Sequence, residues 1–390
     1  MGGSLAPSGI DRVLRDGVAA GVVPQVAAIV ADRDGIVYEG AAGPRVVGGS
    51  GSVGGDSEFA IMSMTKMIAT VAALQLVERG QLELDAPVDT YRPEFADVRV
   101  LDGFDGDTPR LRAPASRATV RQLVTHTTGL GYWFWSADQV RYERVMGLPG
   151  PASGRAVALT APLLADPGTR FSYGINTDWL GLVVEAAAGK TLDVVVEEGI
   201  TGPLGMADTV FVLTGAQRER LVGLHVKDGS GAWKRIDDGV NRDDPEWWAG
   251  GHGLYSTPRD YIRFERALLR GGELDGVRIL SEPTVDAAFR NQIGELDFPP
   301  SLPSADPRSS GALNVGPGWK WGYGMMLNTK DVPGGRRAGS GAWAGLYNTH
   351  FWIDRASGLC ASIYSSSLPF ITEEAFRLYT EFEQAVYAAR

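Results

Sequence analysis

The pattern of hydrophobic and polar positions divides the chain into two mixed α/β ends and a different middle. Residues 10–20 carry apolar side chains at helical spacing, and residues 25–31 and 36–42 predict two strands joined by the turn Asp32-Arg33-Asp34-Gly35. A further helical pattern runs from Met67 to Val77 and stops at Arg79-Gly80. The carboxyl-terminal part predicts three strands and a closing helix, at 321–328, 347–354, 359–365 and 373–388.

The middle of the chain, from 85 to 318, shows short helical patterns separated by Pro- and Gly-rich stretches. We interpret 101–118 and 291–317 as such loops. If the two ends share one sheet, they form a single α/β lobe from residues 1–82 and 319–390, with residues 83–318 inserted as a mainly helical lobe. The fold class is then α/β (α+β), and the cleft between the lobes is the expected place for a site.

The composition of the chain excludes several classes of binding partner but says less about the fold. The 390 residues carry a net charge of −10, which argues against nucleic acid or an anionic membrane as the main partner. No apolar run is long enough to span a bilayer, and the amino-terminal residues lack the basic start and apolar core of a signal peptide, so we expect a cytoplasmic protein. The single cysteine, Cys360, excludes an internal disulfide and lies in a predicted core strand. The sequence indicates no cofactor and does not define an oligomeric state.

Ser63-Met64-Thr65-Lys66 is the strongest chemical signal, because it places a hydroxyl and an amine three residues apart at a helix start. Residues i and i+3 of a helix share a face, so the Lys66 amine can reach the Ser63 hydroxyl and activate it as a nucleophile. The free N–H groups of a helix start also favour negative charge on a substrate oxygen. A serine in this position is more often only a helix cap, so the motif needs partners.

Two later segments provide candidate partners. Tyr173, in Phe171-Ser172-Tyr173-Gly174-Ile175-Asn176, lies at a loop-to-helix junction, where a nearby Lys66 ammonium would lower its phenol pKa. The alternative is an aromatic anchor that packs the loop. The segment 339–346 surrounds Trp343 with small residues, so that a backbone N–H can approach a ligand with the indole as a wall. A Gly-rich turn with a core tryptophan explains this segment equally well.

Other candidates are weaker. The four histidines lack metal-ligand spacing, and no metal site is expected; His126 is interpreted as structural, holding the loop that presents Tyr132. Asp178, at a helix start, and Lys190, in a helix-ending turn, are also interpreted as structural. The aromatic clusters 132–135 and 247–248 are more often core, although the loop position of the first, with Tyr132, makes it a candidate acyl or aryl pocket. No serine has glycines at both −2 and +2, so a nucleophile elbow is absent.

Taken together, these motifs resemble the serine β-lactamase and penicillin-binding-protein superfamily, and more closely the family VIII carboxylesterases with a class C β-lactamase fold. The resemblance runs nearly end to end. It includes the segments 81–88 (QLELDAPV), 123–133 (LVTHTTGLGYW), 203–206 (PLGM) and 250–257 (GGHGLYST).

This resemblance implies a serine β-lactamase/transpeptidase-like fold, an antiparallel sheet flanked by helices with an inserted helical lobe. It implies Ser63 as nucleophile, Lys66 and Tyr173 as the base pair, and an oxyanion hole from the backbone N–H groups of Ser63 and Leu346. It also places the substrate-binding segment at Trp343-Ala344-Gly345, where β-lactamases carry Lys-Thr-Gly.

Two departures from the β-lactamase pattern bear on the substrate. The tyrosine motif has its asparagine at the fourth position, Asn176, so an amide-binding role is not assumed. Trp343 replaces the lysine that pairs with a β-lactam carboxylate, although Arg336 or Arg337 lies close enough in sequence to supply a charge.

The leading hypothesis is a serine carboxylesterase that cleaves short- to medium-chain or aryl esters, small-molecule substrates, through an acyl-enzyme. Tyr173, assisted by Lys66, is expected to take the Ser63 proton as the hydroxyl attacks the ester carbonyl. The alternatives are an acyltransferase, a D-amino-acid amidase or a β-lactamase on the same fold. From another class, the chain could be a catalytically silent scaffold, which would have no need of Ser63, Lys66 and Tyr173 together.

Overall fold

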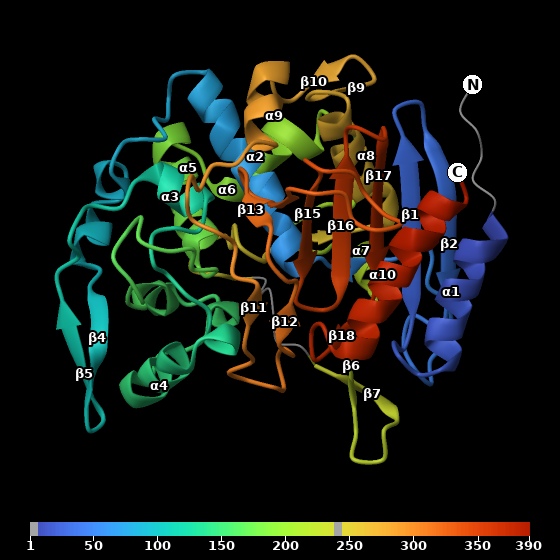
Figure 1. The fold of residues 1–390 in the computed structure, drawn as a ribbon, viewed down its shortest axis with the longest axis horizontal. Helices are drawn as coiled ribbons and strands as arrows, with labels where there is room; N and C mark the ends of the chain where they lie inside the picture. The colour runs from blue at the N-terminus through green and yellow to red at the C-terminus, as the bar shows by residue number, and fades with distance from the viewer. Residues whose placement is uncertain (1–6, 238–243) are drawn as a thin grey trace.

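A seven-stranded antiparallel sheet carries the two ends of the chain (Figure 1). The computed structural model describes residues 7–237 and 244–390. The strand order is β13-β14-β15-β16-β17-β1-β2. These strands are β1 (Val26–Asp32), β2 (Ile36–Ala42), β13 (Trp319–Trp321), β14 (Met326–Asn328), β15 (Gly341–Gly345), β16 (Thr349–Asp354) and β17 (Leu359–Tyr364). Because β1 pairs with β17, the prediction that the two ends share one sheet is confirmed.

The sheet is covered by helices on both faces, which explains why β1 is buried on both sides. Val26, Ala28 and Val30 pack with side chains of α1 (Pro7–Ala19) and α10 (Glu373–Ala388), which lie side by side over one face (Figure 1). The alternate residues of β1 belong to the larger core on the other face, which includes side chains of α8 (Pro258–Leu269).

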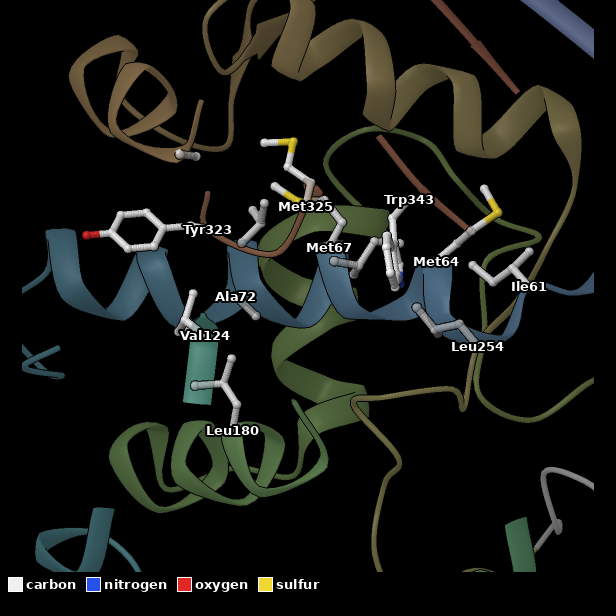
Figure 2. Close-up of a cluster of buried hydrophobic side chains, with 14 of the residues drawn as sticks. Ile61, Met64, Met67, Ala72, Val124, Leu180, Leu254, Tyr323, Met325 and Trp343 are labelled. Carbon is white, nitrogen blue, oxygen red and sulfur yellow. The ribbon is translucent and has the colours of Figure 1, made fainter. Parts of the chain in front are cut away.

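Helix α2 (Thr65–Glu78) lies at the centre of the larger core. Every residue from Thr65 to Leu76 is buried, so the helix is packed on all sides instead of presenting one apolar stripe. Figure 2 shows Met64, Met67 and Ala72 surrounded by apolar side chains from several elements, among them Trp343 of β15. Each such side chain stabilises the fold by about 1.5–3 kcal/mol when fully buried. The start of α2 is therefore held firmly in place.

The rest of the chain forms a second region of short helices and small sheets. Its helices are α3 (Val120–Val124), α4 (Ala137–Met146), α5 (Asn176–Ala188), α6 (Leu192–Val196), α7 (Gly215–Arg220) and α9 (Glu282–Ala288), with a π-helical turn at Glu197–Thr201. Its strand pairs are β3 (Phe59–Ala60) with β8 (Tyr255–Ser256), β4 (Val100–Asp105) with β5 (Thr108–Arg112), β9 (Glu273–Leu274) with β10 (Val277–Arg278), and β11 (Ser301–Leu302) with β12 (Leu313–Asn314). A three-stranded sheet contains β6 (Leu224–Lys227), β7 (Trp233–Ile236) and β18 (Ser367–Leu368).

The structure differs from the sequence prediction in four places. The expected loop at 291–317 contains the short strand pair of β11 and β12. The expected loop at 101–118 contains most of the β4–β5 hairpin, which turns at Gly106 with a positive φ of 57°. The expected strand at 321–328 is the end of β13 and all of β14, separated by a turn with Gly324 at φ 79°. The Gly-rich segment around Trp343 is strand β15. The lobe boundaries 1–82, 83–318 and 319–390 stay a prediction.

Among residues 7–237 and 244–390, none of the helices combines the length and apolar character that crossing a bilayer requires.

Candidate active site

Ser63 lies in a tight turn at the entrance to α2. Strand β3 leads into a 3₁₀ turn, Met62–Met64, from which α2 continues. Met62 adopts a left-handed backbone with φ 49°, a conformation that costs a non-glycine residue on the order of 1–3 kcal/mol. Ser63 is partly exposed while Met62 and Met64 are buried. The turn therefore presents the Ser63 hydroxyl to solvent from an otherwise buried segment.

The end of β15 packs directly against this turn. A Cβ atom at Gly345 would lie 2.3 Å from the carbonyl oxygen of Ile61 and 3.1 Å from the Cβ of Met62. Only glycine permits this approach. The close approach of Gly345 brings β15, with Trp343 and Ala344, next to the Ser63 turn. Leu346 follows directly after this strand.

Lys66 is fully buried and its amine is held by three oxygens. Nζ donates to Ser63 Oγ at 3.1 Å, to the Tyr132 hydroxyl at 3.1 Å and to the Gly251 carbonyl at 2.7 Å. Burial lowers the pKa of Lys66 to about 7, because the ammonium loses its hydration, while the Asp178 carboxylate opposes the shift. Near neutral pH a large share of the Lys66 amine is thus free of its extra proton and able to accept one from Ser63.

Tyr173 is buried next to Lys66 and Trp343. Its hydroxyl accepts a hydrogen bond of 2.8 Å from Trp343 Nε1, and its ring centroid is 4.9 Å from Lys66 Nζ. Burial raises the pKa of Tyr173, although hydrogen bonds with Ser63 and Trp343 act in the opposite direction. The expectation that Lys66 lowers this pKa was therefore wrong, because desolvation of the phenolate outweighs the hydrogen bonds. Tyr173 carries its proton at neutral pH.

Asp178 belongs to the same cluster, which the sequence did not indicate. Its Oδ2 accepts from the Tyr132 hydroxyl at 3.3 Å, its Oδ1 accepts from the Gly251 N–H at 2.7 Å, and His252 Nδ1 lies 3.6 Å from Oδ1. Both groups that Asp178 binds, Tyr132 and Gly251, also bind Lys66. Asp178 thus orients the surroundings of the buried amine, and the interpretation of this residue as purely structural was incomplete.

Tyr132, expected from the sequence to line a substrate pocket, has its hydroxyl in the hydrogen-bond network of Lys66 and Asp178. It is buried, and burial together with the Asp178 charge raises the pKa of its phenol. It therefore links Lys66 to Asp178 as a neutral hydroxyl, while its side also lines a cavity of about 600 Å³ together with Tyr173.

His126 and Asn176 support the tyrosine loop. The His126 ring packs against that of Tyr173 with centroids 4.7 Å apart, and the Gly174 N–H donates to His126 Nδ1 at 3.5 Å. Burial lowers the pKa of His126, so the ring is neutral. The Asn176 amide donates to the carbonyls of Leu130 and Ser172. Asn176 is fully buried, and these contacts engage its amide within the protein.

Neither arginine proposed to replace the missing lysine has an unpaired charge. Arg336 is buried and pairs with Glu383, at 2.5 Å between Nη1 and Oε2, while Arg337 lies 3.5 Å from Asp331. In the described part of the chain, no three His, Cys, Asp or Glu side chains are grouped so that they could hold a metal ion.

Known proteins are similar to this chain over almost its whole length. The family model described as Beta-lactamase matches residues 10–386. Monacolin J acid methylbutanoyltransferase from Aspergillus terreus is 31% identical over 347 residues, 85% of this chain and 82% of that protein. Esterase EstB from Burkholderia gladioli is 31% identical over 385 residues, 92% of this chain and 88% of that protein.

Among solved structures, unliganded simvastatin synthase (LovD) from Aspergillus terreus superposes with a TM-score of 0.82 at 27% identity, covering 97% of each chain. The fold predicted from the sequence is confirmed by this match and by the antiparallel sheet flanked with helices. The chain belongs to the Beta-lactamase family, whose members similar to it include esterases and acyltransferases.

Proposed function

We propose that this protein is a serine carboxylesterase of the family VIII type, which cleaves short- to medium-chain or aryl esters through an acyl-enzyme on Ser63. The observation that carries the proposal is the 3.1 Å contact between Ser63 Oγ and the buried Lys66 amine, whose pKa is lowered to about 7. A hydroxyl next to such an amine has a base within reach at neutral pH.

In the first step, neutral Lys66 accepts the Ser63 proton as Oγ attacks the ester carbonyl. The backbone N–H groups of Ser63 and Leu346 hold the developing oxyanion, with each donor contributing about 3–4 kcal/mol. The close packing of Gly345 on the Ser63 turn supports this pairing of the two donors. Tyr173 keeps its proton at neutral pH and is hydrogen-bonded to Ser63, so we assign it to protonate the leaving alcohol.

In the second step, a water molecule attacks the acyl-enzyme and the acid is released from Ser63 Oγ. The Tyr173 phenolate left by the first step accepts the proton of the water, and Lys66 returns its proton to Ser63. The direction of the two pKa shifts favours Lys66 over Tyr173 as the first base, whereas the sequence led us to expect Tyr173, assisted by Lys66, in that role.

Acyl transfer is the second candidate, in which an alcohol replaces the water of the second step. The observation that favours it is the similarity to a methylbutanoyltransferase over 85% of this chain. The similarity to esterase EstB favours hydrolysis, and the two reactions share the acyl-enzyme.

β-Lactam hydrolysis is the disfavoured alternative despite the family name. A β-lactam carboxylate would have to be buried against Trp343, and the nearby Arg336 and Arg337 are already paired with carboxylates. A neutral ester incurs no such cost.

The test compares kcat/KM for p-nitrophenyl butyrate and for a cephalosporin, with products identified in the presence and absence of an added alcohol. We expect the ester to be cleaved orders of magnitude more efficiently, because the cephalosporin carries an unpaired carboxylate. A preference for the cephalosporin would overturn the esterase proposal. Ester product in place of acid when the alcohol is present would favour the acyltransferase alternative.

A further inference from the structure

A second, smaller cavity lies beside the catalytic tyrosine. We name it the α10 pocket. It has a volume of about 160 Å³ and is bounded by β15 and β16 residues, by α10 and by Trp135. Its lining includes Trp135, Trp343, Ala344, Arg336, Phe376 and Thr380.

Two tryptophans connect the α10 pocket to Tyr173. Trp343 lines the pocket and donates its indole N–H to the Tyr173 hydroxyl. Trp135 lines the pocket as well as the 600 Å³ cavity, and its ring centroid is 5.5 Å from that of Tyr173. The Trp135 indole N–H donates to Ser310 Oγ at 3.2 Å, which fixes this wall between the two cavities.

The position of the α10 pocket along β15 indicates which half of an ester it receives. The acyl carbonyl is placed by the proposed oxyanion donors, at the Leu346 end of the strand. The leaving oxygen is placed by Tyr173, whose hydroxyl is hydrogen-bonded to Trp343, three residues before Leu346 in the chain. The alcohol half of the ester therefore extends from Tyr173 toward Trp343 and Ala344, which border the α10 pocket.

The size of the pocket suits one small apolar group. An engineered cavity of about 150 Å³ lined by apolar side chains binds benzene. A space of about 160 Å³ with aromatic and aliphatic walls accordingly fits one phenyl ring or a short branched alkyl group.

The charges around the pocket select a neutral group. Arg336 and Glu383 both line it and pair with each other, and Arg336 also donates to the Tyr379 hydroxyl at 3.0 Å. His350 is neutral, because burial and the Arg336 charge lower its pKa to about 3. An anionic group would add an unpaired charge to this balanced set. Arg336 Nε is buried without a partner, so one donor remains for a neutral oxygen.

We propose that the α10 pocket binds the alcohol half of the substrate, as an uncharged phenyl or short branched alkyl group. This inference rests on the proposed esterase function and names the substrate class of the same site.

The test fills the pocket from α10 with Thr380→Trp and opens it with Phe376→Ala. Glu381→Trp is the matched control, because Glu381 is exposed on the same helix and does not line the pocket. Two ester series are compared, one with a constant acetyl group and alcohols from ethanol to phenol and 1-naphthol, the other with a constant ethanol and acyl chains of increasing length.

Thr380→Trp should lower kcat/KM for phenyl acetate at least tenfold relative to ethyl acetate, while Phe376→Ala should raise the relative rate on 1-naphthyl acetate. The order of preference among acyl chains should stay unchanged in both, and 4-carboxyphenyl acetate should be poorer than phenyl acetate for the wild type. A change that follows the acyl chain, or an equal effect of Glu381→Trp, would overturn the proposal.

A binding measurement separates this inference from the proposed function. Calorimetric titration of phenol into Ser63→Ala should show binding that Thr380→Trp removes and Glu381→Trp retains. If the wild type cleaves no ester but this binding pattern is found, the function proposal fails, and only the affinity of the pocket for a neutral phenyl group stands. If esters are cleaved and the binding is absent or insensitive to Thr380→Trp, the pocket assignment fails alone.

Discussion

At the scale of single residues, the site combines one buried amine with one buried carboxylate and joins them through neutral groups. Lys66 and Asp178 are both fully buried, and each binds the Tyr132 hydroxyl and the peptide groups of Gly251. A buried lysine without this carboxylate would have a still lower pKa, because the Asp178 charge is what opposes the desolvation. Asp178 therefore adjusts the pH range over which Lys66 can act as a base.

The pH profile tests this role. In the wild type, kcat/KM for p-nitrophenyl butyrate should rise with pH through an apparent pKa of about 7, because only the unprotonated Lys66 accepts the Ser63 proton. Asp178→Asn removes the charge that raises the pKa of Lys66, so the rising limb should move to lower pH, by about one unit. Asp16→Asn, an exposed position on α1, serves as control and should leave the profile unchanged. A limb that moves upward in Asp178→Asn would contradict the assignment of Lys66.

Part of this site could be predicted from the sequence and part could not. Ser63 and Lys66 follow from one local motif, since helical geometry alone places them together. Asp178 could not be assigned in this way, because its partners Tyr132 and Gly251 are 46 and 73 residues away along the chain. The only signal was its place five residues after Tyr173, in the first turn of the following helix.

At the scale of secondary-structure elements, the site depends on how β15 meets the start of α2. The prediction succeeded for elements with a clear period, such as β2 and α10, whose observed bounds equal the expected ones. It missed β15, because glycine and alanine are depleted in strands and give no alternating pattern. β15 forms because it pairs with β14 and β16, and Gly345 is required where the strand touches the Ser63 turn.

Gly345→Ala tests this contact. The added Cβ would collide with the Ile61 carbonyl oxygen, so the strand and the Ser63 turn must separate. We expect a loss of unfolding free energy of about 1–3 kcal/mol and a decrease in kcat/KM greater than tenfold, measured by denaturant unfolding and ester hydrolysis. Gly9→Ala on α1, where a Cβ meets nothing within 4 Å, is the matched control and should be neutral or slightly stabilising. Wild-type activity in Gly345→Ala would contradict the proposed oxyanion arrangement.

At the scale of the whole molecule, the catalytic groups are contributed by both regions of the chain. Ser63 and Lys66 come from the start of the central helix, and Trp343 comes from the sheet. Tyr132 and Tyr173 come from loops of the second region, just before the 3₁₀ turn Trp133–Trp135 and just before α5. The arrangement of the sheet could be foreseen, because both chain ends carry strand patterns. The relative placement of the loops around Tyr132 and Tyr173 depends on tertiary contacts, such as the packing of His126 on Tyr173, that no local pattern specifies.

The most direct test of the central claim is to trap the acyl-enzyme. A serine-directed fluorophosphonate should add one mass increment to the intact protein, and the modified peptide should be the one that contains Ser63. Ser63→Ala should show neither the increment nor ester hydrolysis while it keeps its fold, because Ser63 is partly exposed and is the N-cap residue of neither the 3₁₀ turn nor α2. Lys66→Met should be modified far more slowly than the wild type, since the hydroxyl then lacks its base. Modification at another residue, or near-wild-type hydrolysis by Ser63→Ala, would contradict the assignment of Ser63 as the nucleophile.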